Sequence, residues 1–162
     1  MLVLGVDPGL AATGYGLISY GSGGVRVIEA GVIRSRENDP LARRVGDIHA
    51  GMRDLLTEFH PDVLSMEELY SHYKHPKTAI IMGHARGAVL VAADEQNIPV
   101  RHYAATMVKM ALTGNGRAKK EQVRRMILQT LDLHGPTEPL DTYDALAVAL
   151  CHINHSLKAA VS

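Results

Sequence analysis

Residues 1–20, MLVLGVDPGLAATGYGLISY, hold the pattern that decides the fold. Leu2–Val6 is an apolar run rich in Leu and Val, which predicts a buried β-strand, and Pro8 with the glycine after it predicts the turn that ends the strand. Asp7 is therefore placed where the strand leaves the sheet. An ionised carboxylate at the edge of a core is costly unless a cation meets it, so the sequence predicts a cationic partner for Asp7.

The first strand is followed by two more and then by alternating helices and strands. Turn signals separate the segments 13–20 and 24–35, which is typical of three consecutive strands joined as a meander. A helix over 38–60 comes next, with Asp39 as its N-cap and Pro40 at its first position. The remaining pattern predicts strands at 62–67 and 98–103 and helices at 77–96, 105–112, 118–133 and 140–157.

This order predicts an α/β fold with a mixed five-stranded sheet. Three antiparallel meander strands are followed by two parallel strands, and helices flank the sheet. Because crossovers between parallel strands are right-handed, the strand at 2–7 and the strand at 62–67 are expected to be parallel neighbours. We expect one domain over residues 1–158 and a short tail at 159–162.

Composition excludes several classes of protein. The single cysteine, Cys151, cannot form an internal disulfide, and neither a secretory leader nor a membrane-spanning stretch is evident, which predicts a cytoplasmic protein. Seventeen Lys and Arg balance seventeen Asp and Glu, so the net charge by itself gives no sign of a nucleic-acid partner. The segment 101–125, however, carries seven Lys or Arg residues against one acid, Glu121, which predicts a basic face.

Four acidic residues are expected to meet. Asp7 and Glu67 each end a buried strand at its carboxyl end, the edge at which open α/β sheets bind ligands. Asp141 and Asp144 are three residues apart near the start of the last helix and so share a face, although acids there also suit the helix dipole. Carboxylates gathered without cysteine predict Mg²⁺ or Mn²⁺, and two such ions about 4 Å apart can flank a scissile phosphate.

The segment 114–120, GNGRAKK, is a candidate phosphate-binding site. Glycine lets the backbone approach a phosphate, and a helix N-terminus with Lys119 and Lys120 completes an anion site. Alone, the segment would fit a loop with solvated charges. With the acids, it predicts a patch of Arg117, Lys119, Lys120 and Arg124 that contacts a nucleic-acid backbone.

The helix at 77–96 is apolar round most of its circumference. In so small a domain, a partner chain best explains its second apolar face. The pattern therefore predicts a homodimer through the helix that contains Ile80, Ala88 and Val91.

Five segments resemble the RuvC-type Holliday-junction resolvases of the ribonuclease-H-like superfamily: LGVDPGLAATGYG, MEELY, GHARGAVLVAA, HYAATMVKMALTGNGRAKKEQV and DTYDALAVALCH. The likeness runs from Met1 to about His155. It implies a ribonuclease-H-like fold and an Mg-dependent crossover junction endodeoxyribonuclease that makes paired nicks in opposed strands during recombination and repair. It also implies two Mg²⁺ per active site with Mn²⁺ as a substitute, a homodimer, a branch-migration helicase complex as partner, and no membrane.

The resemblance also implies roles for single residues. The four acids are the metal ligands, Lys109 and Lys120 lie near the cut phosphate, and Tyr70 is an aromatic that wedges into the junction. The expected catalytic residues are Asp7, Glu67, Asp141, Asp144 and Lys120, and the expected DNA-binding residues are Tyr70, Lys109, Arg117, Lys119, Lys120 and Arg124.

Other functions stay open at this point. An actin-like ATP-binding fold needs two domains of this type, and the length argues against it. A related single-domain nuclease that acts on RNA shares the fold and the metal chemistry. A non-catalytic module that binds branched DNA would not need four acids at one edge. His72 and His75 follow Glu67 closely, and we interpret them as ordinary polar loop residues.

Overall fold

The structure, a computed structural model, describes residues 1–69, 76–133 and 141–161. Its sheet has the strand order β3-β2-β1-β4-β5. Antiparallel pairing joins β1 (Leu2–Asp7), β2 (Ala12–Gly21) and β3 (Gly24–Arg34), whereas β4 (Val63–Glu67) pairs in parallel with both β1 and β5 (Val100–Tyr103). The predicted mixed sheet and the parallel pairing of the first and fourth strands are confirmed.

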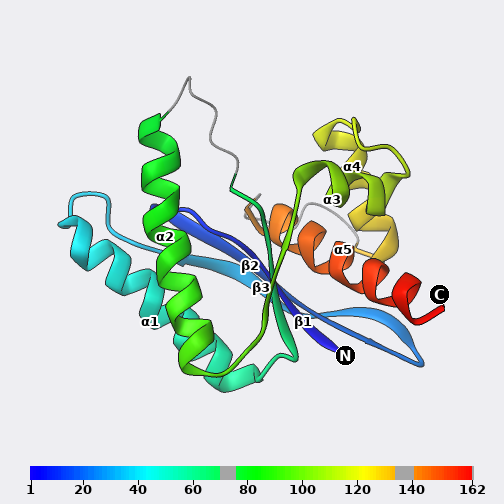
Figure 1. Cartoon of the computed structure of the whole chain (residues 1–162), viewed down its shortest axis with the longest axis horizontal. Coiled ribbons are helices and arrows are strands. Elements are labelled where there is room, and N and C mark those ends of the chain that lie inside the picture. Colours follow the sequence, from blue (N-terminus) through cyan, green and yellow to red (C-terminus); the bar gives the residue numbers. More distant parts are fainter. Residues whose placement is uncertain (70–75, 134–140, 162) are drawn as a thin grey trace.

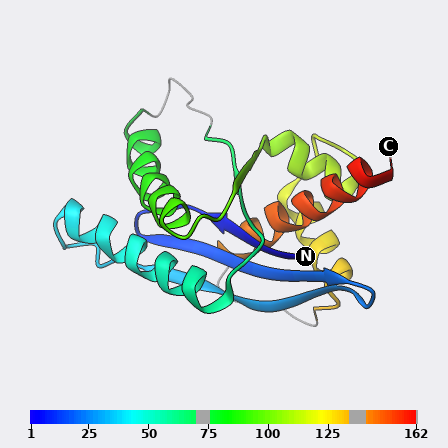
Figure 2. The same ribbon diagram turned by 60° about the horizontal axis from the view of Figure 1, so that its bottom comes forward.

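Helices cover both faces of the sheet (Figure 1). One face carries α1 (Leu41–Phe59) and α2 (Pro76–Glu95), and the other carries α3 (Ala105–Thr113), α4 (Lys120–Thr130) and α5 (Asp141–Val161). Each face has its own hydrophobic core, and the turn between β2 and β3 projects at one end of the molecule (Figure 2). Within the described ranges, no helix has the length and apolar character to cross a membrane.

Two local predictions are wrong. We expected Asp39 to cap α1, but Pro40 is the N-cap residue, and its carbonyl accepts hydrogen bonds from the amides of Arg43 and Arg44. Proline supplies a suitable φ at either position, so sequence alone does not fix the first residue. We also expected Ala88 on the outer face of α2. It is 6% exposed and packs into the core, whereas Ile80 and Val91 are 62% and 53% exposed.

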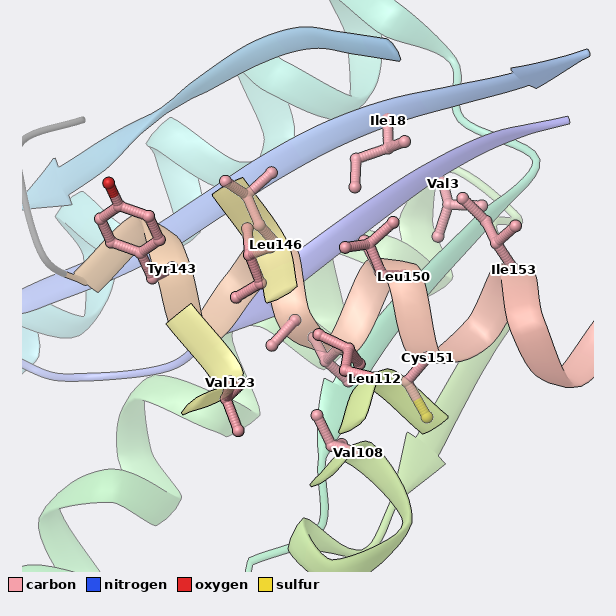
Figure 3. Packing of buried hydrophobic residues seen from close by; sticks show 14 of the residues in the cluster. Val3, Ile18, Val108, Leu112, Val123, Tyr143, Leu146, Leu150, Cys151 and Ile153 are labelled. Atoms are coloured by element: carbon pink, nitrogen blue, oxygen red, sulfur yellow. The ribbon is translucent and has the colours of Figure 1, made fainter. Parts of the chain in front are cut away.

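The helix α5 lies in the middle of its layer, against the sheet on one side and α3 and α4 on the other. Leu146 and Leu150 point toward Val3 and Ile18 of the sheet, and Cys151 lies on the side nearer α3 (Figure 3). Burial of this central helix therefore ties the C-terminal part of the chain to the first strand.

A side-chain-free slot in the sheet lets α5 come close. Gly5 of β1 and Gly16 of β2 are directly paired across the strands. A Cβ at Gly5 would lie 1.9 Å from the carbonyl oxygen of Ala145, and a Cβ at Gly16 would lie 2.6 Å from a methyl of Leu146. Glycine at both positions thus allows the first turns of α5 to rest on the backbone of β1 and β2.

Candidate active site

Three of the predicted acids lie at one edge of the sheet. Because Val6 pairs with Met66 in parallel register, the next residues, Asp7 and Glu67, end their strands side by side. Asp144 directly precedes Ala145, the residue of α5 whose carbonyl abuts Gly5. The strand ends and the close approach of α5 therefore bring the three acids to the rim of one cavity of about 530 Å³.

Basic side chains from three helices surround the same cavity. Lys109 comes from α3, Lys120 and Arg124 come from α4, and Arg86 comes from α2. The guanidinium of Arg124 lies over the ring of Tyr143, 4.6 Å from its centroid, which is the geometry of a cation–π contact. Apolar side chains of α3, α4 and α5 also line the cavity, among them Val108, Val123, Ile127 and Ala147.

Acidic and basic side chains lie close together in the cavity and affect one another's charge. Lys120 Nζ lies 2.9 Å from Asp144 Oδ2, although 81% of the lysine side chain is exposed, so water weakens this ion pair. Burial first, and then repulsion by Asp144, raise the pKa of Glu67, while Lys109 and Lys120 oppose the rise. Glu67 is exposed to solvent, yet the protein around it removes enough water to disfavour its charged form.

These donors fit a hard divalent cation. Carboxylate oxygens are the ligands that Mg²⁺ and Mn²⁺ prefer, and a cation between Glu67 and Asp144 would relieve their repulsion. Among the described residues, no three His, Cys, Asp or Glu side chains come close enough together to hold a metal by themselves. Asp141, the fourth predicted ligand, begins α5, but its side chain lies outside the described part of the structure.

The other predicted residues divide into two groups. Lys109, Lys120 and Arg124 line the cavity, whereas Arg117 and Lys119 are exposed just before α4 and do not line it. Tyr70, His72 and His75 lie outside the described residues.

The segment before α4 is held by local hydrogen bonds. The Asn115 side chain accepts one from the Arg117 amide at 2.9 Å, and the Gln122 side chain accepts one from the Lys119 amide at 2.8 Å. These bonds fix the backbone that carries the two exposed basic residues beside the cavity.

Sequence reasoning missed Arg86. Its Nη1 donates to the backbone oxygen of Glu67 at 2.6 Å, and its Nη2 lies 2.7 Å from Nδ1 of His102. Burial lowers the pKa of Arg86, and the Glu68 carboxylate opposes this effect. Burial and then Arg86 lower the pKa of His102, again against Glu68. The only signal in the sequence is a charge inside an apolar helix.

Comparisons with known proteins agree with a nuclease function. The sequence model of the family described as crossover junction endodeoxyribonuclease RuvC matches residues 3–152. The crossover junction endodeoxyribonuclease RuvC of Rhodopirellula baltica is 45% identical over 149 residues, which are 92% of this chain and 84% of that protein. The protein of the same name from Moorella thermoacetica is 43% identical over 152 residues, 94% of this chain and 90% of its own.

Solved structures extend the likeness to three dimensions. RuvC of T. thermophilus in complex with a Holliday junction substrate superposes with a TM-score of 0.91 at 37% identity, covering 98% of this chain and 96% of that one. The yeast mitochondrial Holliday junction resolvase Ydc2 shares the fold with a TM-score of 0.67 at 15% identity, covering 97% of this chain and 82% of that one.

Proposed function

The chain belongs to the RuvC family of crossover junction endodeoxyribonucleases, and we propose that the cavity of Asp7, Glu67 and Asp144 is the site at which it cuts four-way DNA junctions. The protein is thus a nuclease, and its family implies dependence on a divalent metal ion. One observation carries the assignment of the site: three carboxylates from distant parts of the chain and the cations Lys109 and Lys120 line one cavity.

The metal ligands in this proposal are Asp7, Glu67, Asp141 and Asp144, and they hold two Mg²⁺, for which Mn²⁺ can substitute. When bound, the two ions supply an activated water and stabilisation of the leaving 3′ oxygen. Lys120 pairs with Asp144 and adds positive charge beside the cut phosphate, and Lys109 adds a second positive charge from α3. These cations favour the approach of a polyanion to a site rich in acids.

DNA contacts in this proposal extend outward from the cavity. Lys109, Lys120 and Arg124 meet the phosphates next to the cut, and Arg117 and Lys119 meet the backbone further along. Tyr70 stacks on an unpaired base at the centre of the junction, a contact for which the family resemblance is the support.

A homodimer would place two such sites for the paired nicks in opposed strands. The outer face of α2 supports it: Ile80 and Val91 are exposed, and a Cβ at Gly83 or Gly87 would meet nothing within 4 Å. Small residues between large apolar ones let a second copy of the helix come close. We further propose one domain over 1–158 with a short tail, a cytoplasmic location, and a branch-migration helicase complex as partner.

A cleavage assay with matched variants tests the site. We expect the protein to cut a mobile four-way junction with Mg²⁺ and to leave linear duplex DNA and an RNA hairpin largely intact. Glu67→Gln should lower junction cleavage by orders of magnitude and keep junction binding, since removing a negative charge does not weaken the attraction of phosphates. Its neighbour provides the control, because Glu68→Gln should be far milder.

Three results would contradict the proposal. Full activity of Glu67→Gln would remove this residue from the metal site. Preferred cleavage of the RNA hairpin would favour a related nuclease that acts on RNA. Tight junction binding without cleavage in any divalent metal would leave only a module that binds branched DNA.

A further inference from the structure

The guanidinium of Arg86 links three elements of the fold beside the cavity. It projects from α2, donates to the backbone oxygen of Glu67 at the end of β4, and reaches Nδ1 of His102 on β5. The two contacts use different nitrogens, Nη1 and Nη2, at 2.6 and 2.7 Å. Because arginine has donors only, Nδ1 of His102 must accept this hydrogen bond. Nη1 and Nη2, the two terminal nitrogens of the forked guanidinium group, therefore each donate one hydrogen bond to a different partner.

These contacts fix the peptide group that follows Glu67. The Glu67 oxygen accepts from Arg86, and the amide of Glu68 donates to the Tyr103 oxygen at 2.9 Å. Glu67 is the last residue of β4 and pairs with Tyr103, the last residue of β5. Beyond the end of a strand, the backbone loses the regular hydrogen bonds to neighbouring strands. Arg86 therefore supplies a hydrogen bond to the Glu67 backbone oxygen at this position.

We propose that Arg86 is a positioning residue that holds the backbone of Glu67, and so aims the Glu67 carboxylate at the metal. The inference rests on the proposed role of Glu67 as a ligand. Arg86 acts through the peptide group and does not contact the scissile phosphate. Partners that orient metal ligands change metal affinity or activity by about 10–100-fold when they are lost, and we expect an effect of this size.

The fork of arginine explains why lysine would not replace it. A single ammonium on a flexible stem lacks the rigid pair of nitrogens that bonds the Glu67 oxygen and His102 together. Arg86→Lys keeps the positive charge in the cavity wall but loses this double contact. The variant thus separates the position of Glu67 from the electrostatic attraction of DNA.

The test uses Mn²⁺ as the probe on the full-length protein without DNA, with bound metal followed by electron paramagnetic resonance. We expect Arg86→Lys to weaken Mn²⁺ binding about tenfold. His102→Gln, at an exposed position, loses one arm of the fork and should weaken it by a smaller factor. The control is Arg44→Lys, because Arg44 makes a comparable contact with the Ser35 hydroxyl at 3.1 Å, on α1 and outside the cavity. It should leave Mn²⁺ binding unchanged.

Junction binding in the absence of metal completes the test. Arg86→Lys should bind the junction within about twofold of the unaltered protein, with the same salt dependence. Saturating Mn²⁺ should restore part of its cleavage rate. Weaker metal-free binding with a reduced salt slope would overturn the inference, because Arg86 would then be a phosphate contact.

Glu67→Gln, measured in the same series, distinguishes failure of the inference from failure of the proposed site. If Glu67→Gln weakens Mn²⁺ binding and neither Arg86→Lys nor His102→Gln does, the positioning role is wrong and the site stands. If Glu67→Gln leaves Mn²⁺ binding unchanged, Glu67 is not a ligand, and both conclusions fall together.

Discussion

Replacing Gly5 by alanine tests how the fold assembles the site. The added Cβ would lie 1.9 Å from the Ala145 oxygen and 2.9 Å from the Ala145 carbonyl carbon. Real Cβ atoms essentially never approach another heavy atom closer than 3.0 Å, so β1 and α5 must move apart by about 1 Å. Both contacts are with backbone, which no change of rotamer can relieve.

The magnitude of the effect follows from this displacement. Overpacking a core costs about 1–3 kcal/mol of unfolding free energy, and a clash between two backbones belongs at the upper end of that range. Asp144 directly precedes Ala145 and would move with it, away from Asp7 and Glu67. Because a misplacement of about 1 Å can cost a factor of about 100 in rate, Gly5→Ala should lose cleavage even at temperatures where it remains folded.

Urea unfolding and single-turnover junction cleavage measure the two effects. The control is Gly21→Ala, since Gly21 also lies in a strand but a Cβ there would meet nothing within 4 Å. The control should match or slightly exceed the stability of the unaltered protein. The reasoning is refuted if Gly5→Ala unfolds within about 0.5 kcal/mol of Gly21→Ala, a difference no larger than that of ordinary surface substitutions, and cleaves at the same rate.

Three further predictions concern the outer face of α2, the DNA-binding residues and the buried thiol of Cys151. Val91→Glu should give folded monomers by sedimentation, whereas Ala88→Glu should unfold the protein, because Ala88 is in the core. Lys119→Ala should weaken binding to junction and duplex alike and lower the log–log salt slope by about 0.9, whereas Tyr70→Ala should weaken junction binding more than duplex binding and leave the slope unchanged. Burial raises the pKa of the Cys151 thiol from 9.0 to about 11, so alkylation at pH 8 should be slow until the protein unfolds. Stability contributed by this thiol is fully present below pH 9 and should be lost as the pH rises through about 11.

The sheet could be predicted from sequence because its signals are local. Apolar runs that end in Pro or Gly mark β1 and β2, an apolar run that follows Pro61 marks β4, and crossover handedness then limits the order of the strands. The meeting of Asp7 and Glu67 follows from that order alone, since parallel neighbours end at the same edge. The position of Asp144 needed one further step, the packing of the last helix onto the sheet.

Contacts between distant backbone groups could not be predicted in the same way. Gly5 and Gly16 look like ordinary strand glycines until their pairing and the approach of Ala145 are known. Arg86 looks like a solvated charge until the Glu67 oxygen is seen within its reach. Both depend on the separation between elements, which periodicity does not encode. Ala88 was misplaced because α2 is apolar on nearly every side, and such a helix carries no sequence signal of which face is buried.

The slot formed by Gly5 and Gly16 also has a consequence for the order of events on the ribosome. β1 supplies Asp7 and is synthesised long before α5, the helix that fills the slot. Contacts between such distant segments form late, because closing the intervening chain costs entropy before the contact stabilises anything. Until α5 has emerged, a nascent chain holds Asp7 and Glu67 without Asp144. We therefore expect the nascent chain to have no nuclease activity until α5 has left the ribosome and packed into the slot.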